Sequence, residues 1–93
     1  MTPEQAANKM MDLSEEQSRL SDRATELEVA EQLFLHQNRE NFKSDKATVS
    51  AWKVTEQGIE QIRAIGRLRV LKSELSVIKN FLRHEENKAR NIY

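Results

Sequence analysis

The sequence contains no cysteine, which excludes disulfide bonds, thiolate metal sites and thiol nucleophiles. It has only one proline and two glycines in 93 residues, so few positions oppose a continuous helix. No apolar run approaches the ~18 residues of a membrane-spanning helix, and the N-terminus lacks the basic and apolar regions of a signal peptide. We therefore expect a soluble, cytoplasmic protein that spans no membrane.

An excess of charge of one sign is also absent, because 15 Lys and Arg residues balance 15 Asp and Glu residues. The field of the whole chain therefore steers it neither to nucleic acid nor to an anionic membrane. The charges are nevertheless unevenly distributed: residues 1–46 hold ten acidic and six basic side chains, and residues 47–93 hold five acidic and nine basic ones. An anion-binding surface is thus to be sought in the second half.

What the sequence does have is the composition and periodicity of long helices. Charged residues make up 32% of the chain, and Leu, Ile, Val and Phe account for 22 of the 93 residues, above the roughly 20% below which disorder is expected. Thr2, Pro3 and Gln5 form a helix start, with Thr2 as N-cap and Gln5 completing a capping box. Apolar residues then recur every seven positions, at Ala6, Leu13, Leu20, Leu27 and Phe34.

A second helix is predicted after a polar break in which Ser44 or Asp45 can act as N-cap. It carries Val49, Trp52, Ile59, Ile62 and Ile65, followed by an alternation of three- and four-residue spacings from Leu68 to Ile92. Gly58 and Gly66 indicate either a mild bend or the close approach of another backbone. One uninterrupted helix of more than 80 residues is the competing interpretation, which base rates oppose.

The predicted fold is all-α, a single domain over residues 1–93 forming a long, coiled-coil-like antiparallel helical hairpin. Its first helix covers about 3–42, its turn about 43–46 and its second helix about 46–91. With this turn, residues whose numbers add to about 90 lie at the same level. Asp12 then faces Lys79, but Arg23 faces Arg67 and Glu16 faces Glu74, so like charges meet as often as opposite ones.

The apolar surface is wider than one partner helix can cover. A second stripe lies beside the main seam of the second helix, the first helix broadens near its end, and Trp52 is either an exposed hot spot or packs against Phe42. A homo-oligomer, most simply a dimeric four-helix bundle, is the leading expectation, and a docking face for a different protein is the alternative. The candidate interface residues are Val70, Val77, Phe81, Leu33, Phe34 and Trp52.

A basic strip also runs along the second helix and consists of Arg69, Lys72, Lys79, Arg83 and Arg90. It can contact phosphate or an acidic partner, complement the acidic first helix, or remain solvated. These alternatives keep open a nucleic-acid-binding accessory protein and an oligomer that sequesters a small anionic ligand.

Catalytic chemistry is not indicated. The two histidines, His36 and His84, lie on different helices and at different levels of the predicted hairpin, and no phosphate-binding glycine loop or paired nucleophile and base is present. A two-helix rod offers its carboxylates no cleft that would shift their pKa values. The sequence therefore predicts a non-enzyme with no catalytic, cofactor-binding or metal-binding residues and no cofactor.

The layout resembles small coiled-coil accessory proteins encoded by tailed bacteriophages and prophages. The resemblance covers most of the chain as a pattern: Phe34, Leu35 and Phe42, the Ser44-Asp45-Lys46 break, Ala51-Trp52, and Leu68-x-x-Leu71-Lys72-x-x-Leu75. It implies a protein of the host cytoplasm that binds, and inhibits, a host factor of defence or replication, or that assists phage replication or recombination. It transfers no functional residue to this chain.

Overall fold

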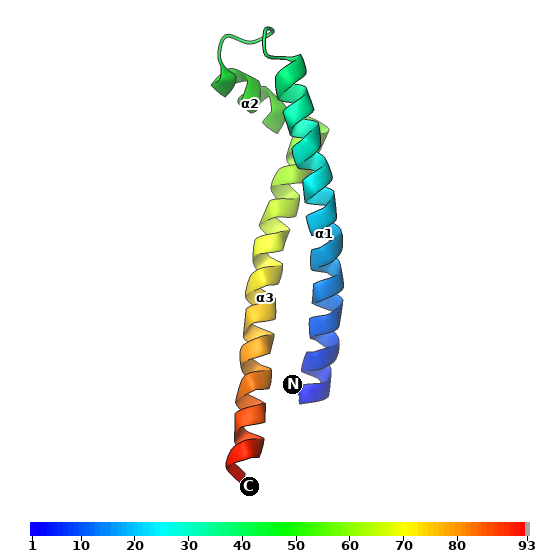
Figure 1. Cartoon of the computed structure of the whole chain (residues 1–93), viewed down its shortest axis with the longest axis vertical. Coiled ribbons are helices and arrows are strands. Elements are labelled where there is room, and N and C mark those ends of the chain that lie inside the picture. The colour runs from blue at the N-terminus through cyan, green and yellow to red at the C-terminus, as the bar shows by residue number, and fades with distance from the viewer. Residues whose placement is uncertain (93) are drawn as a thin grey trace.

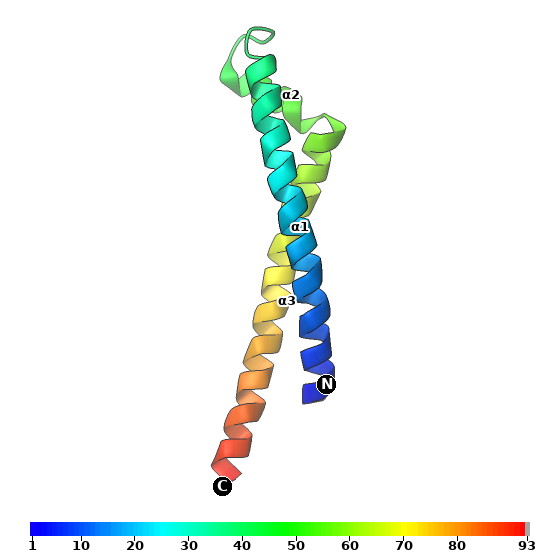
Figure 2. The same ribbon diagram turned by 45° about the vertical axis from the view of Figure 1, so that its right-hand side comes forward.

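A computed structural model describes the backbone of residues 1–92 and the side chains of residues 1–90. The chain forms three helices, α1 (Pro3–Gln37), α2 (Asp45–Lys53) and α3 (Glu56–Ile92). The long helices α1 and α3 lie side by side in opposite directions, and the short α2 crosses the end of α1 (Figures 1 and 2). This confirms the predicted all-α helical hairpin; the side chain of Ile92, in the predicted apolar pattern, lies outside the described residues.

The helix starts follow the capping signals of the sequence. The Thr2 side chain accepts a hydrogen bond from the Gln5 backbone N–H at 3.1 Å, and the Thr2 backbone N–H donates to Gln5 Oε1 at 3.0 Å, which completes the capping box. Ser44 caps α2 by accepting a hydrogen bond from the backbone N–H of Ala47 at 3.1 Å. The end of α1 differs, because α1 ends at Gln37 rather than near residue 42. Asn38 ends it through its side-chain amide, which donates to the Phe34 carbonyl oxygen at 2.9 Å.

The expected second helix is broken at Val54 and Thr55, which separate α2 from α3. Thr55 provides the new helix start, because its hydroxyl oxygen accepts a hydrogen bond from the Gly58 backbone N–H at 3.0 Å. The same hydroxyl donates to the Trp52 carbonyl oxygen at 2.6 Å and so ties the end of α2 to the start of α3. The sequence signal for this break was a threonine directly before Glu56, an N-cap pattern inside an otherwise apolar-periodic segment.

Gly58 lies where this junction is tightest. A Cβ atom at this position would lie 1.9 Å from the Trp52 carbonyl oxygen, so only glycine fits without displacing the α2 backbone. Gly58 thus meets the close approach of another backbone that was one of the two expectations for the glycines. At Gly66, by contrast, a Cβ atom would meet nothing within 4 Å.

Two ion pairs define how α1 and α3 align. Arg23 of α1 donates two hydrogen bonds to Glu60 of α3, and Arg67 of α3 donates two to Glu16 of α1, at 3.0 and 2.9 Å. Helical side chains point toward the N-terminus of their own helix, which displaces the level of a contact along the axis. Because the arginine lies on α1 in one pair and on α3 in the other, the displacements in the two pairs are opposite and cancel. In both pairs the residue numbers add to 83.

The predicted alignment, with numbers adding to about 90, was therefore wrong by seven residues. A displacement of seven residues keeps apolar heptad positions facing apolar heptad positions, so the apolar pattern cannot distinguish the two alignments. The charges do distinguish them. The expected like-charge neighbours Arg23–Arg67 and Glu16–Glu74 are replaced by two opposite-charge pairs.

The buried residues show which face of each long helix is covered. Ala6, Leu13 and Leu27 are buried and Leu20 is half-buried, as the seven-residue spacing of the first helix predicted. On α3, the end near the C-terminus buries Leu71, Leu75 and Ile78. Near its start, however, Gly58 is buried against α2 and Ala64 is buried, while three predicted core residues are 41–53% exposed: Ile59, Ile62 and Ile65.

The molecule is a rod with principal extents of 69 × 19 × 16 Å. Its radius of gyration is 19.8 Å, whereas a compact domain of this length would have about 12 Å. With numbers adding to 83, α3 from about Arg83 onward extends past the first residue of α1, and Figure 1 shows the C-terminal end protruding beyond the N-terminus. None of the three helices, within the described residues, has a stretch both long and apolar enough to traverse a lipid bilayer.

The two ion pairs predict a pH dependence of stability. The hydrogen bonds from Arg67 and Arg23 lower the pKa of Glu16 and of Glu60, respectively, below the ordinary value of 4.5. A carboxyl group whose pKa is lowered by folding stabilises the fold above its unfolded-state pKa, and this contribution is lost as the pH falls through the folded-state pKa. We expect a Glu16→Gln/Glu60→Gln double variant to melt below the wild type at pH 7 and together with it near pH 2, in circular dichroism melts. An equal difference at both pH values would contradict this account.

Candidate functional site

Trp52 belongs to the interior of the hairpin tip and not to an open interface. Only 2% of its surface is exposed, its ring lies 5.5 Å from that of Phe34 between ring centres, and its indole N–H donates to Gln61 Oε1 at 2.7 Å. The prediction that Trp52 and Phe34 belong to one intermolecular apolar surface is therefore corrected. The break at Val54–Thr55 turns α2 against both long helices, which encloses the indole.

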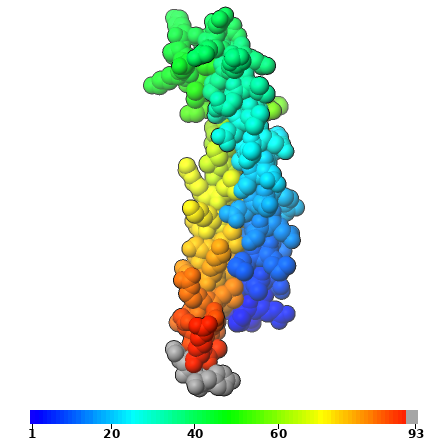
Figure 3. All heavy atoms as spheres, viewed as in Figure 1, coloured from blue at the N-terminus to red at the C-terminus, as the bar shows by residue number. Residues whose placement is uncertain are grey.

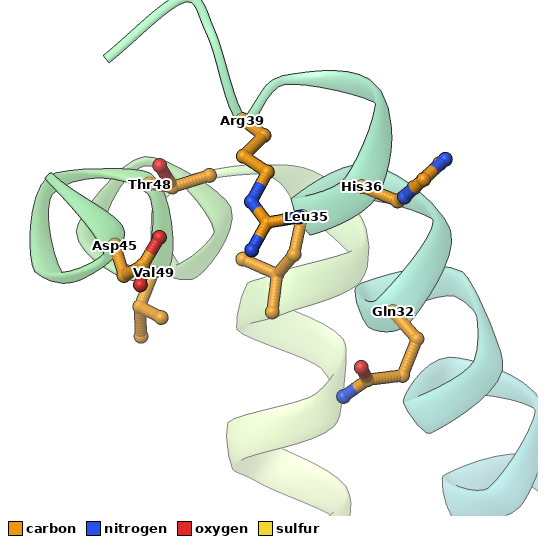
Figure 4. Close-up of a pocket in the computed structure, with 7 residues that line it drawn as sticks. All are labelled: Gln32, Leu35, His36, Arg39, Asp45, Thr48 and Val49. Atoms are coloured by element: carbon orange, nitrogen blue, oxygen red, sulfur yellow. The ribbon is translucent and has the colours of Figure 1, made fainter. Parts of the chain in front are cut away.

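A hollow of ≈ 270 Å³ lies at the tip between the end of α1 and α2. Figure 4 shows the side chains around it, contributed by α1, the connection and α2: Gln32, Leu35, His36, Arg39, Asp45, Thr48 and Val49. Thr48 is the buried member, and its hydroxyl donates to the Ser44 carbonyl oxygen at 3.0 Å. This hydrogen bond lies within the first turn of α2, at the closed end of the tip.

The basic strip divides into three parts. Lys72, Lys79 and Arg83 line one groove of ≈ 390 Å³ between α3 and α1, together with Gln17 and without a carboxylate among the lining residues. Arg69 is exposed but lies outside that groove, and Arg90 pairs with Glu86 at 2.7 Å on the overhanging end of α3. The strip is thus solvated rather than neutralised by α1, and three of its five members share one hollow.

An extended exposed apolar feature lies along α3, and its two ends border open hollows that α3 shares with α1. At 100° per residue, six uncharged positions project within an arc of about 80°. We call them the outer stripe, and they are Ile59, Ile62, Gly66, Val70, Ser73 and Val77. All six are exposed, with 69% exposure at Val77 and 53% at Ile62. From Ile59 to Val77 the outer stripe runs for about 27 Å at 1.5 Å per residue.

The outer face of α1 has no such continuity. Met11, Val29 and Leu33 are exposed there, but Glu15, Asp22 and Glu26 lie between or beside them on the same face. Of the other predicted interface residues, Val70 and Val77 belong to the outer stripe, whereas Phe81 packs against the core cluster of the hairpin. Phe81 is therefore corrected to a residue at the edge of the internal core.

Sequence reasoning found Val70 and Val77 but missed Ile59, Ile62, Gly66 and Ser73 as members of this surface. The isoleucines were assigned to the core because they lie in line with Val49 and Trp52 ahead of the three- and four-residue spacings that begin at Leu68. The missed signals were two small buried residues near the start of α3: Gly58, which packs against the α2 backbone at Trp52, and Ala64.

The arrangement offers surfaces rather than a reaction chamber. The two long helices run side by side along the face drawn in Figure 3, and the hollows between elements are open grooves. Within residues 1–90, no three side chains of His, Cys, Asp or Glu are grouped so that they could hold a metal ion. The geometry is suited to binding along a helix face.

Comparison of the chain with protein-family models, curated proteins and solved structures found no match.

The contrast between the two glycines gives a prediction. We expect Gly58→Ala to lower the free energy of unfolding by about 1–3 kcal/mol, because the added methyl group collides with the Trp52 carbonyl. Gly66→Ala is the matched control, and we expect it to raise the stability of the single hairpin, measured at a protein concentration that keeps the chain monomeric, by roughly 1 kcal/mol, the usual gain for alanine over glycine inside a helix. Urea denaturation measures both. Destabilisation of equal size by the two substitutions would refute the close contact at Gly58.

Proposed function

We propose that this chain is a non-enzymatic interaction protein that binds a partner helix along the outer stripe of α3. The observation that carries the proposal is the combination of length, exposure and lack of charge in that stripe, on a helix whose opposite face is already covered by α1. A helix with apolar residues on two sides needs a covering element on each. The hairpin supplies one of them.

The exposed area supports this proposal. The chain exposes 7355 Å², whereas a compact monomer of 10.8 kDa would expose about 5,500 Å². Part of the excess comes from the rod shape. An interface of standard size buries roughly 800 Å² per partner, which the excess more than accommodates.

The resemblance to phage accessory proteins extends the proposal to its biology. It implies that the chain acts in the cytoplasm of a bacterial host and inhibits a host protein of defence or replication. A long rod with a well-packed tip is suited to that task, because its surfaces are held rigid before the partner arrives and less ordering is needed on binding.

A photo-crosslinking experiment tests the proposed binding face. We expect benzoylphenylalanine at Val70 or Val77 to yield cross-linked products of defined mass when cells expressing the chain are irradiated, because both positions lie on the outer stripe. Val29, 57% exposed on the outer face of α1, is the matched control and should remain uncoupled. Products of equal yield at Val29, or none at Val70 and Val77, would reject the outer stripe as the binding face.

The basic groove favours a second candidate function, binding of nucleic acid. Three phosphate contacts by Lys72, Lys79 and Arg83 would weaken the affinity for an oligonucleotide by about 40-fold between 50 and 200 mM salt. Fluorescence anisotropy with labelled single- and double-stranded oligonucleotides measures this loss. Lys72→Glu/Lys79→Glu should abolish the binding, and Lys43→Glu in the connection is the control. If the wild type does not bind at 50 mM salt, this second function is excluded.

A further inference from the structure

We propose that the helix covering the outer stripe is α3 of a second copy of this chain, packed antiparallel about a two-fold axis level with residue 68. The inference rests on the proposed function and names its partner. Three features of the chain carry it: the fit of the outer stripe to itself, the charges beside it, and the length of the rod.

The outer stripe is complementary to itself when reversed. In an antiparallel pair centred at residue 68, facing residues have numbers that add to 136. Gly66 then faces Val70 of the second copy, and Ile59 faces Val77 of the second copy. Because the interface is two-fold symmetric, each of these contacts occurs twice. The depression at Gly66 receives Val70 of the second copy. The end of the stripe that carries the larger isoleucines lies against the Val77 end of the second copy.

Nothing inside the chain accounts for glycine at position 66. A Cβ atom there would meet no atom within 4 Å, whereas Gly58 is required by the Trp52 carbonyl. A glycine inside a helix costs about 1 kcal/mol relative to alanine. In the proposed pair the missing side chain lets Val70 of the second copy approach the backbone, and this contact offsets the cost of the glycine.

Charges beside the stripe agree with the same centre. Arg63 and Glu74 lie on the same edge, and their numbers add to 137, so Arg63 of each copy faces Glu74 of the other. Arg63 takes part in no ion pair among residues 1–90, and Glu74 has only a 3.9 Å contact with Arg67. On the other edge the two copies of Arg69 approach each other, and their long stems allow both charged groups to extend into water.

The level of the two-fold axis also matches the middle of the rod. If α3 were extended backward as a straight helix, the level of Gln37, where α1 ends, would correspond to position 46, because the numbers of facing residues add to 83. At its other end α3 reaches Ile92. The midpoint is 69, one residue from the proposed axis. Two rods paired in this way overlap over their whole length, with the two α3 helices in the middle and the two α1 helices outside.

Cysteine cross-linking tests the register, and the chain has no cysteine of its own to interfere. Gly66→Cys and Val70→Cys are made as separate variants. Each alone should give almost no disulfide dimer, because its two copies lie four residues apart along the axis, about 6 Å. A mixture of the two variants should give the mixed disulfide on oxidation, since positions 66 and 70 face each other within disulfide reach.

A disulfide dimer from Gly66→Cys or Val70→Cys alone would indicate a parallel or displaced pair and would overturn the proposed register. Absence of the mixed disulfide, or a chain that is monomeric in light scattering at about 100 μM, would overturn the proposal as a whole.

A charge exchange provides an independent test. Arg63→Glu and Glu74→Arg each place like charges opposite one another twice, so each variant alone should dimerise about tenfold more weakly than the wild type. Mixed together they restore both attractive pairs, and the mixed dimer should regain an affinity near that of the wild type. Lys43→Glu is the control for a change of charge without a facing partner, and circular dichroism verifies that every variant is folded. Failure of the mixture to recover affinity would refute the Arg63–Glu74 contact.

The photo-crosslinking experiment distinguishes the proposed binding face from the proposed identity of the partner. A product of twice the chain mass at Val70 supports self-association. A product of another mass keeps the outer stripe as a binding face and rejects the second copy as its occupant.

Discussion

The tight contact between the Trp52 carbonyl and Gly58 is the constraint on which the rest of the molecule depends. It brings the end of α2 against the start of α3, and Thr55 ties the two backbones together. This junction fixes how α3 leaves the end of α2. Farther along α3, Ala64 is buried while Ile59, Ile62 and Ile65 are exposed. The 37-residue helix α3 thus packs against α2 at its first turn and against α1 along its length, and one of its sides stays exposed.

The hairpin itself was predictable because its signals are local and strong. The Thr2 capping box, the Ser44 N-cap and the seven-residue recurrence from Ala6 to Leu27 each specify a helix or its start, and the structure bears them out. The alignment of the helices was not predictable from apolar spacing, because a displacement of one heptad leaves the apolar matches unchanged. The pairs Arg23–Glu60 and Glu16–Arg67 carry that information, and they become readable only when the break at Val54–Thr55 is known.

The residues of the candidate site also divide into those that were predictable from local signals and those that depended on tertiary structure. Val70 and Val77 could be assigned from projection because they lie in the regular part of α3, where the phase of the helix was correctly read. Trp52, Phe34 and Phe81 could not, because their covering comes from α2 and from a shifted α1, both of which are tertiary features. These residues therefore moved from the predicted surface to the interior once the positions of α2 and α1 were known.

The overhang of α3 has a consequence for how firmly that end of the molecule holds its shape. From about Arg83 onward the helix has no α1 beside it, and Arg90–Glu86 is an exposed contact within one turn. A solitary helical segment of about ten residues is marginal in water, because its nucleus is costly and each hydrogen bond returns little. Its helicity therefore depends on its continuity with the packed part of α3. A binding partner that packs against this segment would supply the tertiary contacts that α1 does not make there.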